Sequence, residues 1–257
     1  MNYPDWLIDI IRCPETQQNL AYRGNSFIRS DHLNYPIIDE IARLVSPPNS
    51  FGEDVKWQKF YDMFAPFYDL SERIIASWLS GVNVTKEREK IISLLNLKKG
   101  ISILEVSPGP GVYQKFIRKN IGEDGKIVAL DLSIGMLKQC QKRSKDLGVS
   151  LIQGNASYLP FADESFDSLF HFGGVNLFSE PEKALKEFVR VVRKGGTVAW
   201  GDEGLSPNFP NNLKKKILLK SNPGFAKPPL PIPEGLINIK KHYVFNGICY
   251  LIVGTKS

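Results

Sequence analysis

From residue 101 to residue 203 the chain alternates short apolar runs with segments of helical periodicity. The apolar runs are ISILEV, KIVALDLS, SLIQGN, SFDSLFHFG and TVAWGDE. Short apolar strands separated by helices pair in parallel, with helices covering both faces of the sheet. This alternation excludes an all-helical or an all-β domain and predicts an α/β fold.

The end of the chain breaks the alternation. HYVFNGICYLIVGT, residues 242–255, places Asn246 and Gly247 between two strand-like runs. Asn-Gly between such runs is the strongest short signal for a β-hairpin. We therefore expect the mostly parallel sheet to finish with an antiparallel pair.

Bulk properties narrow the class of protein. The chain has 257 residues, a formal net charge of +6 and three cysteines far apart in the sequence. No apolar run reaches the roughly 18 residues of a membrane span. The start, MNYPDWLIDI, has no basic segment typical of a secretory signal. Together with the dispersed cysteines, this predicts a cytoplasmic protein.

The positive charge gathers near the end of the sequence. Residues 205–257 hold eight lysines against one glutamate, whereas residues 1–50 hold four arginines against six acids. A basic end suits nucleic acid, an anionic membrane surface or an acidic substrate. Solubility alone explains it equally well, so all four readings stay open for NNLKKKILLK.

The segment ILEVSPGPG, residues 103–111, predicts a buried strand that runs into a ligand-binding loop. Gly109 and Gly111 allow the main chain to approach a ligand closely. Ser107 stands where such loops often carry their first glycine. Asp131 ends the next strand, 20 residues after Gly111, where a carboxylate can accept hydrogen bonds from ribose hydroxyls.

The same loop discriminates between cofactors. A dinucleotide site would have a third glycine where this chain has Gln114, and the phosphate-binding pattern of a triphosphate site is absent from the sequence. Glu105 would repel phosphates but tolerate a cation. We therefore expect a nucleoside ligand without phosphates.

At this point the sequence resembles the class I S-adenosylmethionine-dependent methyltransferases, particularly the branch of ubiquinone and menaquinone biosynthesis. The resemblance covers roughly residues 56–257. Its motifs, in order, are ILEVSPGPG, VALDLSIGML, GNASYLPFADESFD, LKEFVRVVRKGGTV and the Asn-Gly hairpin. It implies a Rossmann-like sheet of seven strands in the order 3-2-1-4-5-7-6, with an antiparallel last strand, and S-adenosylmethionine as the cofactor.

The resemblance also implies the residues of the site. Asn155 stands where the family has an acid that accepts from the adenine amino group, and Tyr61 or Tyr68 lies in the segment that covers the cofactor. The implied substrate-side residues are Tyr61, Tyr68, Gly173 and Asn176. The implied cofactor-binding residues are Glu105, Ser107, Gly109, Gly111, Asp131, Leu132, Met136, Asn155, Ala156, His171 and Phe172.

Residues 7–45 resemble the small zinc-ribbon-like domain that activates some methyltransferases as a separate subunit. A tetrahedral zinc site needs four Cys or His ligands. Only Cys13 remains of the cysteine pairs, with Gln17 near its expected partner and His32 the one histidine. We therefore predict a metal-free α+β unit over residues 1–46, a linker over 47–55, and a methyltransferase domain over 56–257.

Methyl transfer depends mainly on aligning the acceptor, the methyl group and the sulfur, so a general base is not required. His171 is a weak candidate for one. The proline-rich segment 205–235 suits a cover over a small apolar or lipid-like acceptor, which is the favoured substrate class, and peripheral membrane contact is compatible with it. The alternatives are an RNA methyltransferase and a non-catalytic binding module.

Overall fold

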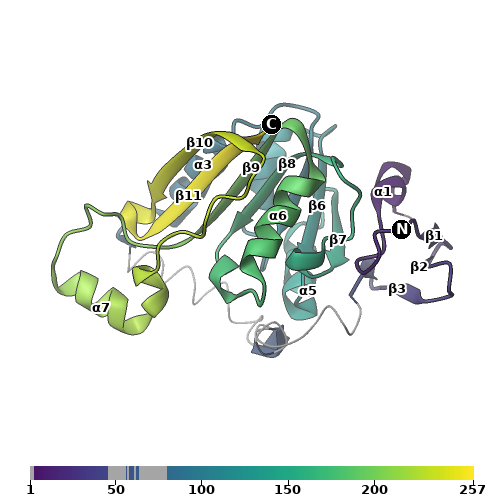
Figure 1. Cartoon of the computed structure of the whole chain (residues 1–257), viewed down its shortest axis with the longest axis horizontal. Helices are drawn as coiled ribbons and strands as arrows, with labels where there is room; N and C mark the ends of the chain where they lie inside the picture. The colour runs from purple at the N-terminus through teal and green to yellow at the C-terminus, as the bar shows by residue number, and fades with distance from the viewer. Residues whose placement is uncertain (1–2, 46–55, 57, 61, 64–79) are drawn as a thin grey trace.

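The computed structural model describes residues 3–45, 56, 58–60, 62–63 and 80–257. The predicted linker, 47–55, and the candidate residues Tyr61 and Tyr68 lie outside the described residues. Helices cover both faces of one large twisted sheet (Figure 1).

The central part of the sheet has the predicted arrangement. Its strands run in the order β7-β6-β5-β8-β9-β11-β10. Neighbours from β7 to β9 are parallel, whereas β11 is antiparallel to both β9 and β10. The bounds are β5 Ser102–Val106, β6 Lys126–Asp131, β7 Val149–Gln153, β8 Phe166–Phe172, β9 Val192–Glu203, β10 Leu236–Val244 and β11 Cys249–Lys256. The α/β fold is confirmed.

The hairpin between β10 and β11 turns at the predicted dipeptide. Asn246 and Gly247 both have positive φ, 57° and 84°, and they lie in a short 3₁₀ turn, η5, Phe245–Gly247. Asparagine and glycine tolerate this conformation better than other residues. The turn therefore reverses the last strand, as the sequence predicted.

Alternate side chains of the strands enter two different cores. Ile103 of β5 packs with helices α3 and α4 on one face, and Leu104 packs with helix α6 on the other. This is the two-residue period of a strand buried on both sides. The helices are α3 Val84–Leu94, α4 Gln114–Ile121, α5 Ile134–Arg143, α6 Pro181–Val191 and α7 Leu213–Ser221, with short 3₁₀ turns η2 Ala156–Tyr158, η3 Val175–Leu177 and η4 Pro223–Ala226.

The sheet is wider than the seven strands expected. The N-terminal unit adds four strands, so that eleven strands of the described residues form one sheet. Its last strand pairs in parallel with β7, with Ile41 opposite Leu151. The elements are α1 Asp5–Ile10, β1 Ala21–Tyr22, β2 Ser26–Ile28, β3 Asn34–Ile38 and β4 Ile41–Arg43. The count of seven was wrong because a strand remote in sequence joins the edge of the sheet.

The N-terminal unit shares its core with the rest of the chain. Leu7, Phe27 and Tyr35 belong to the same buried cluster as Phe188 of α6. The Tyr3 hydroxyl donates to the Leu151 carbonyl oxygen at 2.6 Å. The apolar residues of the N-terminal unit therefore complete a core that they share with α6.

Cys13 of the ribbon-like segment makes protein contacts. Its buried Sγ lies 3.5 Å from the Tyr35 hydroxyl oxygen and 3.6 Å from an Arg29 guanidinium nitrogen. The Gln17 amide donates to the Leu159 carbonyl at 3.2 Å. Within the described ranges, no group of three or more His, Cys, Asp or Glu side chains is placed to hold a metal ion. The likeness to a zinc ribbon stays a prediction.

The carboxyl ends of β5, β6, β8 and β9 meet at one edge of the sheet, which we call the carboxyl edge. Strands β10 and β11 join there through η5. The backbone of Leu205 bonds to Phe225 and that of Ser206 to Gly247, which brings the segment containing α7 to this edge. In Figure 1, α7 lies at one end of the molecule and the N-terminal unit at the other.

Candidate functional site

The loop after β5 has an unusual backbone at three positions. Ser107, Gly109 and Gly111 have φ values of 52°, 54° and 77°. Serine in this left-handed region costs about 1–2 kcal/mol relative to its usual conformations. The Ser107 amide donates to the Leu130 carbonyl at 2.7 Å, which helps to hold the turn. Ser107 thus keeps the backbone shape that glycine would adopt.

The two loop glycines are required for different reasons. A Cβ on Gly111 would lie 3.0 Å from both Cys140 Sγ and Gln114 Oε1. A Cβ on Gly109 would meet no protein atom within 4 Å. Gly111 therefore allows close packing inside the protein, whereas Gly109 faces open space from which a ligand can approach the main chain.

Asp131 connects the loop to the end of β6. One carboxylate oxygen accepts from the Gly109 amide at 3.2 Å, and the other accepts from the Ser133 amide at 2.9 Å. The side chain is nearly buried. Burial raises the pKa of Asp131 to about 7, and the two amide donors only partly offset that effect. Further hydrogen-bond donors, such as hydroxyl groups, would stabilise the charged form of this carboxylate.

A second carboxylate, Asp62, reaches the same place from the segment before α3. Its Oδ1 accepts from the Ser133 hydroxyl at 2.6 Å and from the Gly135 amide at 2.8 Å. It thereby caps the N-terminus of α5, where a negative charge is favourable. Sequence reasoning singled out Tyr61 and missed Asp62, because a cap supplied by a distant segment leaves no local pattern.

Glu105 lies beneath the loop and is almost fully buried. Its Oε2 has no hydrogen-bond partner among the described residues. Burial raises the pKa of Glu105 to about 8; a hydrogen bond with Gln114 opposes the rise and the charge of Asp131 adds to it. Gln114 also donates to Cys140 Sγ at 2.9 Å. Gln114, which breaks the dinucleotide pattern, therefore belongs to a buried polar cluster under the loop.

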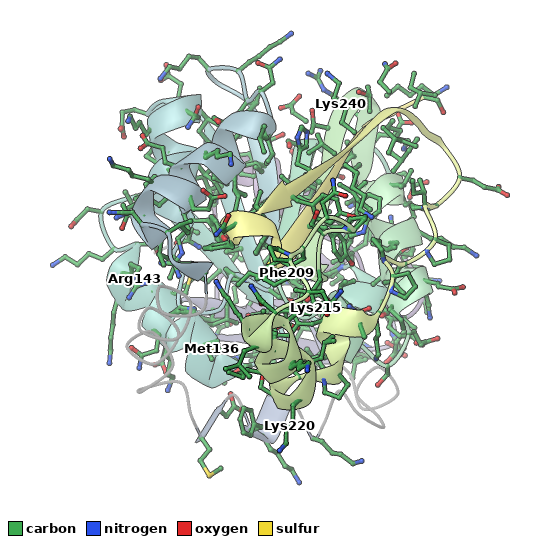
Figure 2. The ribbon with its side chains drawn as sticks, turned by 90° about the vertical axis from the view of Figure 1, so that its left-hand side faces the viewer. Met136, Arg143, Phe209, Lys215, Lys220 and Lys240 are labelled. Atoms are coloured by element: carbon green, nitrogen blue, oxygen red, sulfur yellow. The ribbon has the colours of Figure 1, made fainter. Side chains whose placement is uncertain are left out.

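The residues expected near an adenine come together where β6 and β7 end. Gln153 donates to the Leu132 carbonyl at 3.0 Å, and Met136 is buried in the first turn of α5 (Figure 2). Asn155 and Ala156 are buried at the start of η2. The Asn155 Oδ1 accepts from the Ser157 amide at 2.9 Å, so the oxygen assigned to the adenine amino group already has one donor.

His171 points into the core rather than toward the carboxyl edge. Its Nδ1 lies 3.0 Å from the Val106 carbonyl oxygen, and its ring packs against Phe178 and Phe188. Burial lowers the pKa of His171, because the interior disfavours the charged ring. The geometry suits a neutral structural histidine and gives no support to the role of general base.

The loop after β8 is held by a buried carboxylate, Asp202 at the end of β9. Its oxygens accept from the Gly174 amide at 3.0 Å, the Asn176 amide at 2.9 Å and the Glu203 amide at 2.8 Å. Gly173 and Asn176, the expected substrate-side residues, thus lie in a loop fixed to β9. Phe172 packs against Tyr113.

A cavity of about 260 Å³ lies beside the end of β9. It is an open pocket, lined by residues of β10, of β11 and of the proline-rich segment that follows α7. Its walls include Leu205, Phe225, Tyr243 and Tyr250, with Lys227 and Lys241 among the lining residues. Aromatic and aliphatic walls with a few polar groups are typical of small-molecule pockets.

The structure thus brings two groups of residues to the carboxyl edge. One, around Gly109, Asp131 and Met136, has the features of a nucleoside site. The other, around Asp202, lies between the β8 loop and the cavity. Strands β5 and β8 are neighbours in the sheet, so the two groups adjoin, as in a site that brings two molecules together.

Comparison with known proteins shows a likeness in part of the sequence and in the fold. Residues 104–200 match the profile of the methyltransferase domain family. The fold resembles a SAM-dependent methyltransferase of Aquifex aeolicus, at 22% identity and a TM-score of 0.50, over 66% of this chain and 89% of that one. It also resembles phosphoethanolamine N-methyltransferase 2 of Haemonchus contortus in complex with S-adenosyl-L-methionine, at 15% identity and a TM-score of 0.54, over 75% and 60% of the two chains. Residues 104–200 thus match a methyltransferase domain, and the fold is that of S-adenosylmethionine-dependent methyltransferases.

Among its curated relatives is the demethylmenaquinone methyltransferase of Listeria welshimeri. The two sequences are 31% identical over 161 residues, which is 62% of this chain and 66% of the relative. The chain thus spans just under two thirds of that relative's length.

Proposed function

We propose that the protein transfers a methyl group from S-adenosylmethionine to a small apolar or lipid-like acceptor. The observation that carries the proposal is Asp131, a nearly buried carboxylate held by the loop amide of Gly109 at the carboxyl edge of the sheet. Its burial, and the open space in front of Gly109, suit the ribose of a nucleoside.

The charge of the site supports a cofactor without phosphates. Two carboxyl groups, those of Asp131 and Asp62, lie beside the loop, and the charge of Asp62 adds to the effect of burial in raising the pKa of Asp131. Phosphates would be repelled by this arrangement. S-adenosylmethionine instead carries a sulfonium cation and an uncharged adenosine, and the cation gives the methyl group its reactivity.

The residues of this chain would then bind and orient the cofactor and the acceptor. Asp131 would accept from the ribose hydroxyls, Met136 would lie against the adenine, and the main chain at Gly109 would contact the methionine part. Asp202 would hold the Gly173–Asn176 loop in the position that the acceptor requires. Alignment alone can supply much of the rate enhancement of such a displacement.

The acceptor class is supported by the cavity beside β9. Its lining combines aliphatic and aromatic side chains with lysines and other polar groups, which suits an acceptor that has an apolar ring and polar substituents. Two relatives of the chain are named demethylmenaquinone methyltransferase, and demethylmenaquinone is an acceptor of this kind. We assign the cavity to the apolar part of the acceptor, with the proline-rich segment as its cover.

The proposal is tested in two steps. Isothermal titration should show binding of S-adenosylmethionine, and Asp131→Asn should weaken it whereas Asp124→Asn, in an exposed turn, should not. Incubation with methyl-labelled S-adenosylmethionine and demethylmenaquinone in detergent should then move label into the organic phase. Binding without transfer to any lipid extract would contradict the acceptor class, and absence of binding would contradict the whole proposal.

A further inference from the structure

Helix α7 carries two exposed aliphatic side chains on its outer face. Leu213 is 72% exposed and Ile217 is 43% exposed. They are four residues apart, so they lie one above the other on the same side of the helix. Neighbouring large aliphatic side chains that remain in water mark a surface made for contact.

Lysines surround this aliphatic pair. Lys216 and Lys220 are exposed on the same outer face, because helical spacing places them between and beside Leu213 and Ile217. Lys214 and Lys215 are half-buried on the flanks, and the sequence of α7, LKKKILLKS, contains no acid. Figure 2 shows α7 from outside the molecule, with Lys220 at its lower end and Lys215 nearer the body.

The opposite face of α7 is anchored. Leu218 is fully buried and belongs to the same cluster as Phe209 and Phe225. Asn212 caps the helix by accepting from the Lys215 amide at 3.1 Å. The outer face is therefore presented by a helix fixed in position, and its exposure does not come from a frayed end.

We propose that the outer face of α7, defined by Leu213, Lys216, Ile217 and Lys220, docks on an anionic lipid bilayer. Aliphatic side chains between lysines fit the boundary between acyl chains and acidic headgroups. Because these side chains lie along one side of the nine-residue helix, which is about 13 Å long, docking would place the helix in the plane of the surface. Every helix of the described residues is too short or too polar to cross a bilayer.

Nucleic acid fits this face less well. Lysines would bind phosphates, but unstacked bases bind mainly on aromatic rings. The outer face of α7 offers aliphatic side chains instead. Docking there would turn the carboxyl edge toward the lipid, since the residues around α7 bond to Leu205 and Ser206 beside the cavity. The inference stands apart from the proposed chemistry, because it rests on the surface alone.

The test is co-sedimentation of the full chain with vesicles of phosphatidylcholine alone or mixed with phosphatidylglycerol. The protein should bind only the anionic vesicles, and added salt should weaken binding. The double variants Leu213→Ser with Ile217→Ser and Lys216→Glu with Lys220→Glu should each lower the partition coefficient at least about tenfold.

Matched controls lie at the opposite edge of the sheet. Ile237→Ser with Ile239→Ser removes two other exposed aliphatics, and Lys98→Glu with Lys194→Glu makes the same charge change. Both should bind anionic vesicles like the unmodified protein, and circular dichroism should show all variants folded. Equal binding to neutral vesicles would overturn the proposal. Vesicle binding that the α7 variants leave unchanged would also overturn it. A third contrary result would be binding to a single-stranded RNA that the Lys216→Glu with Lys220→Glu variant loses and the Leu213→Ser with Ile217→Ser variant retains in full.

Discussion

Replacing the buried Glu105 with glutamine should change how stability depends on pH. Burial raises the pKa of Glu105 from 4.5 to about 8. Between these values the unfolded chain releases a proton that the folded protein keeps, so the free energy of unfolding falls as pH rises. The free energy of unfolding falls by about 1.4 kcal/mol per pH unit, which amounts to about 5 kcal/mol over the interval between the two pKa values. Above about pH 8 this loss of stability is complete.

Glutamine has nearly the same shape as protonated glutamate but does not titrate. Urea unfolding of the protein and of Glu105→Gln at several pH values from 5 to 8 should therefore show the variant gaining relative stability as pH increases. Glu123→Gln, at an exposed position, should show a constant difference from the unmodified protein. A difference for Glu105→Gln that is equally constant would refute a buried, protonated Glu105.

Three further predictions concern the site. Asp131→Asn should weaken S-adenosylmethionine binding about 10- to 100-fold in calorimetry, because hydrogen bonds to a charged group contribute about 1.5–3 kcal/mol; an unchanged affinity would exclude a ribose contact. Gly111→Ala should lower the free energy of unfolding more than Gly109→Ala, since only the new Cβ at position 111 would meet neighbours at 3.0 Å. Gly109→Ala should instead weaken cofactor binding by more than its small effect on stability explains. Asp202→Asn should lower the free energy of unfolding by about 1–3 kcal/mol, because one of the three amides that it binds would face an NH₂ group; a variant as stable as the unmodified protein in urea would show that Asp202 does not hold the loop.

Local patterns predicted much of this fold. Strand and helix alternation, and the turn at Asn246 and Gly247, depend on the residues of each segment and their neighbours, so the sequence displays them directly. The loop with Gly109 and Gly111, followed by Asp131, was equally visible because its spacing reflects one strand-loop-helix-strand unit. In the structure the Gly109 amide donates to the Asp131 carboxylate, and the binding of a ligand at this loop stays a prediction.

Features that depend on distant contacts were not predictable in the same way. Asp62 meets Ser133 only because a remote segment covers the end of β6. The orientation of His171 depends on α6, whose Phe188 lies against its ring. Asn155 was assigned to a ligand by analogy, although its oxygen caps η2. A sequence shows which side chains are available, but tertiary packing decides where each one points.

The pairing of β4 with β7 has a consequence for the architecture of the whole domain. An outermost strand presents unpaired backbone groups that can recruit another chain and start aggregation. Here the backbone of Ile41–Arg43 occupies those groups on Leu151–Gln153, and the short strands that follow narrow the sheet to a two-residue strand at its margin. Residues 3–45 thus protect this edge of the sheet against intermolecular strand addition, whatever else they contribute.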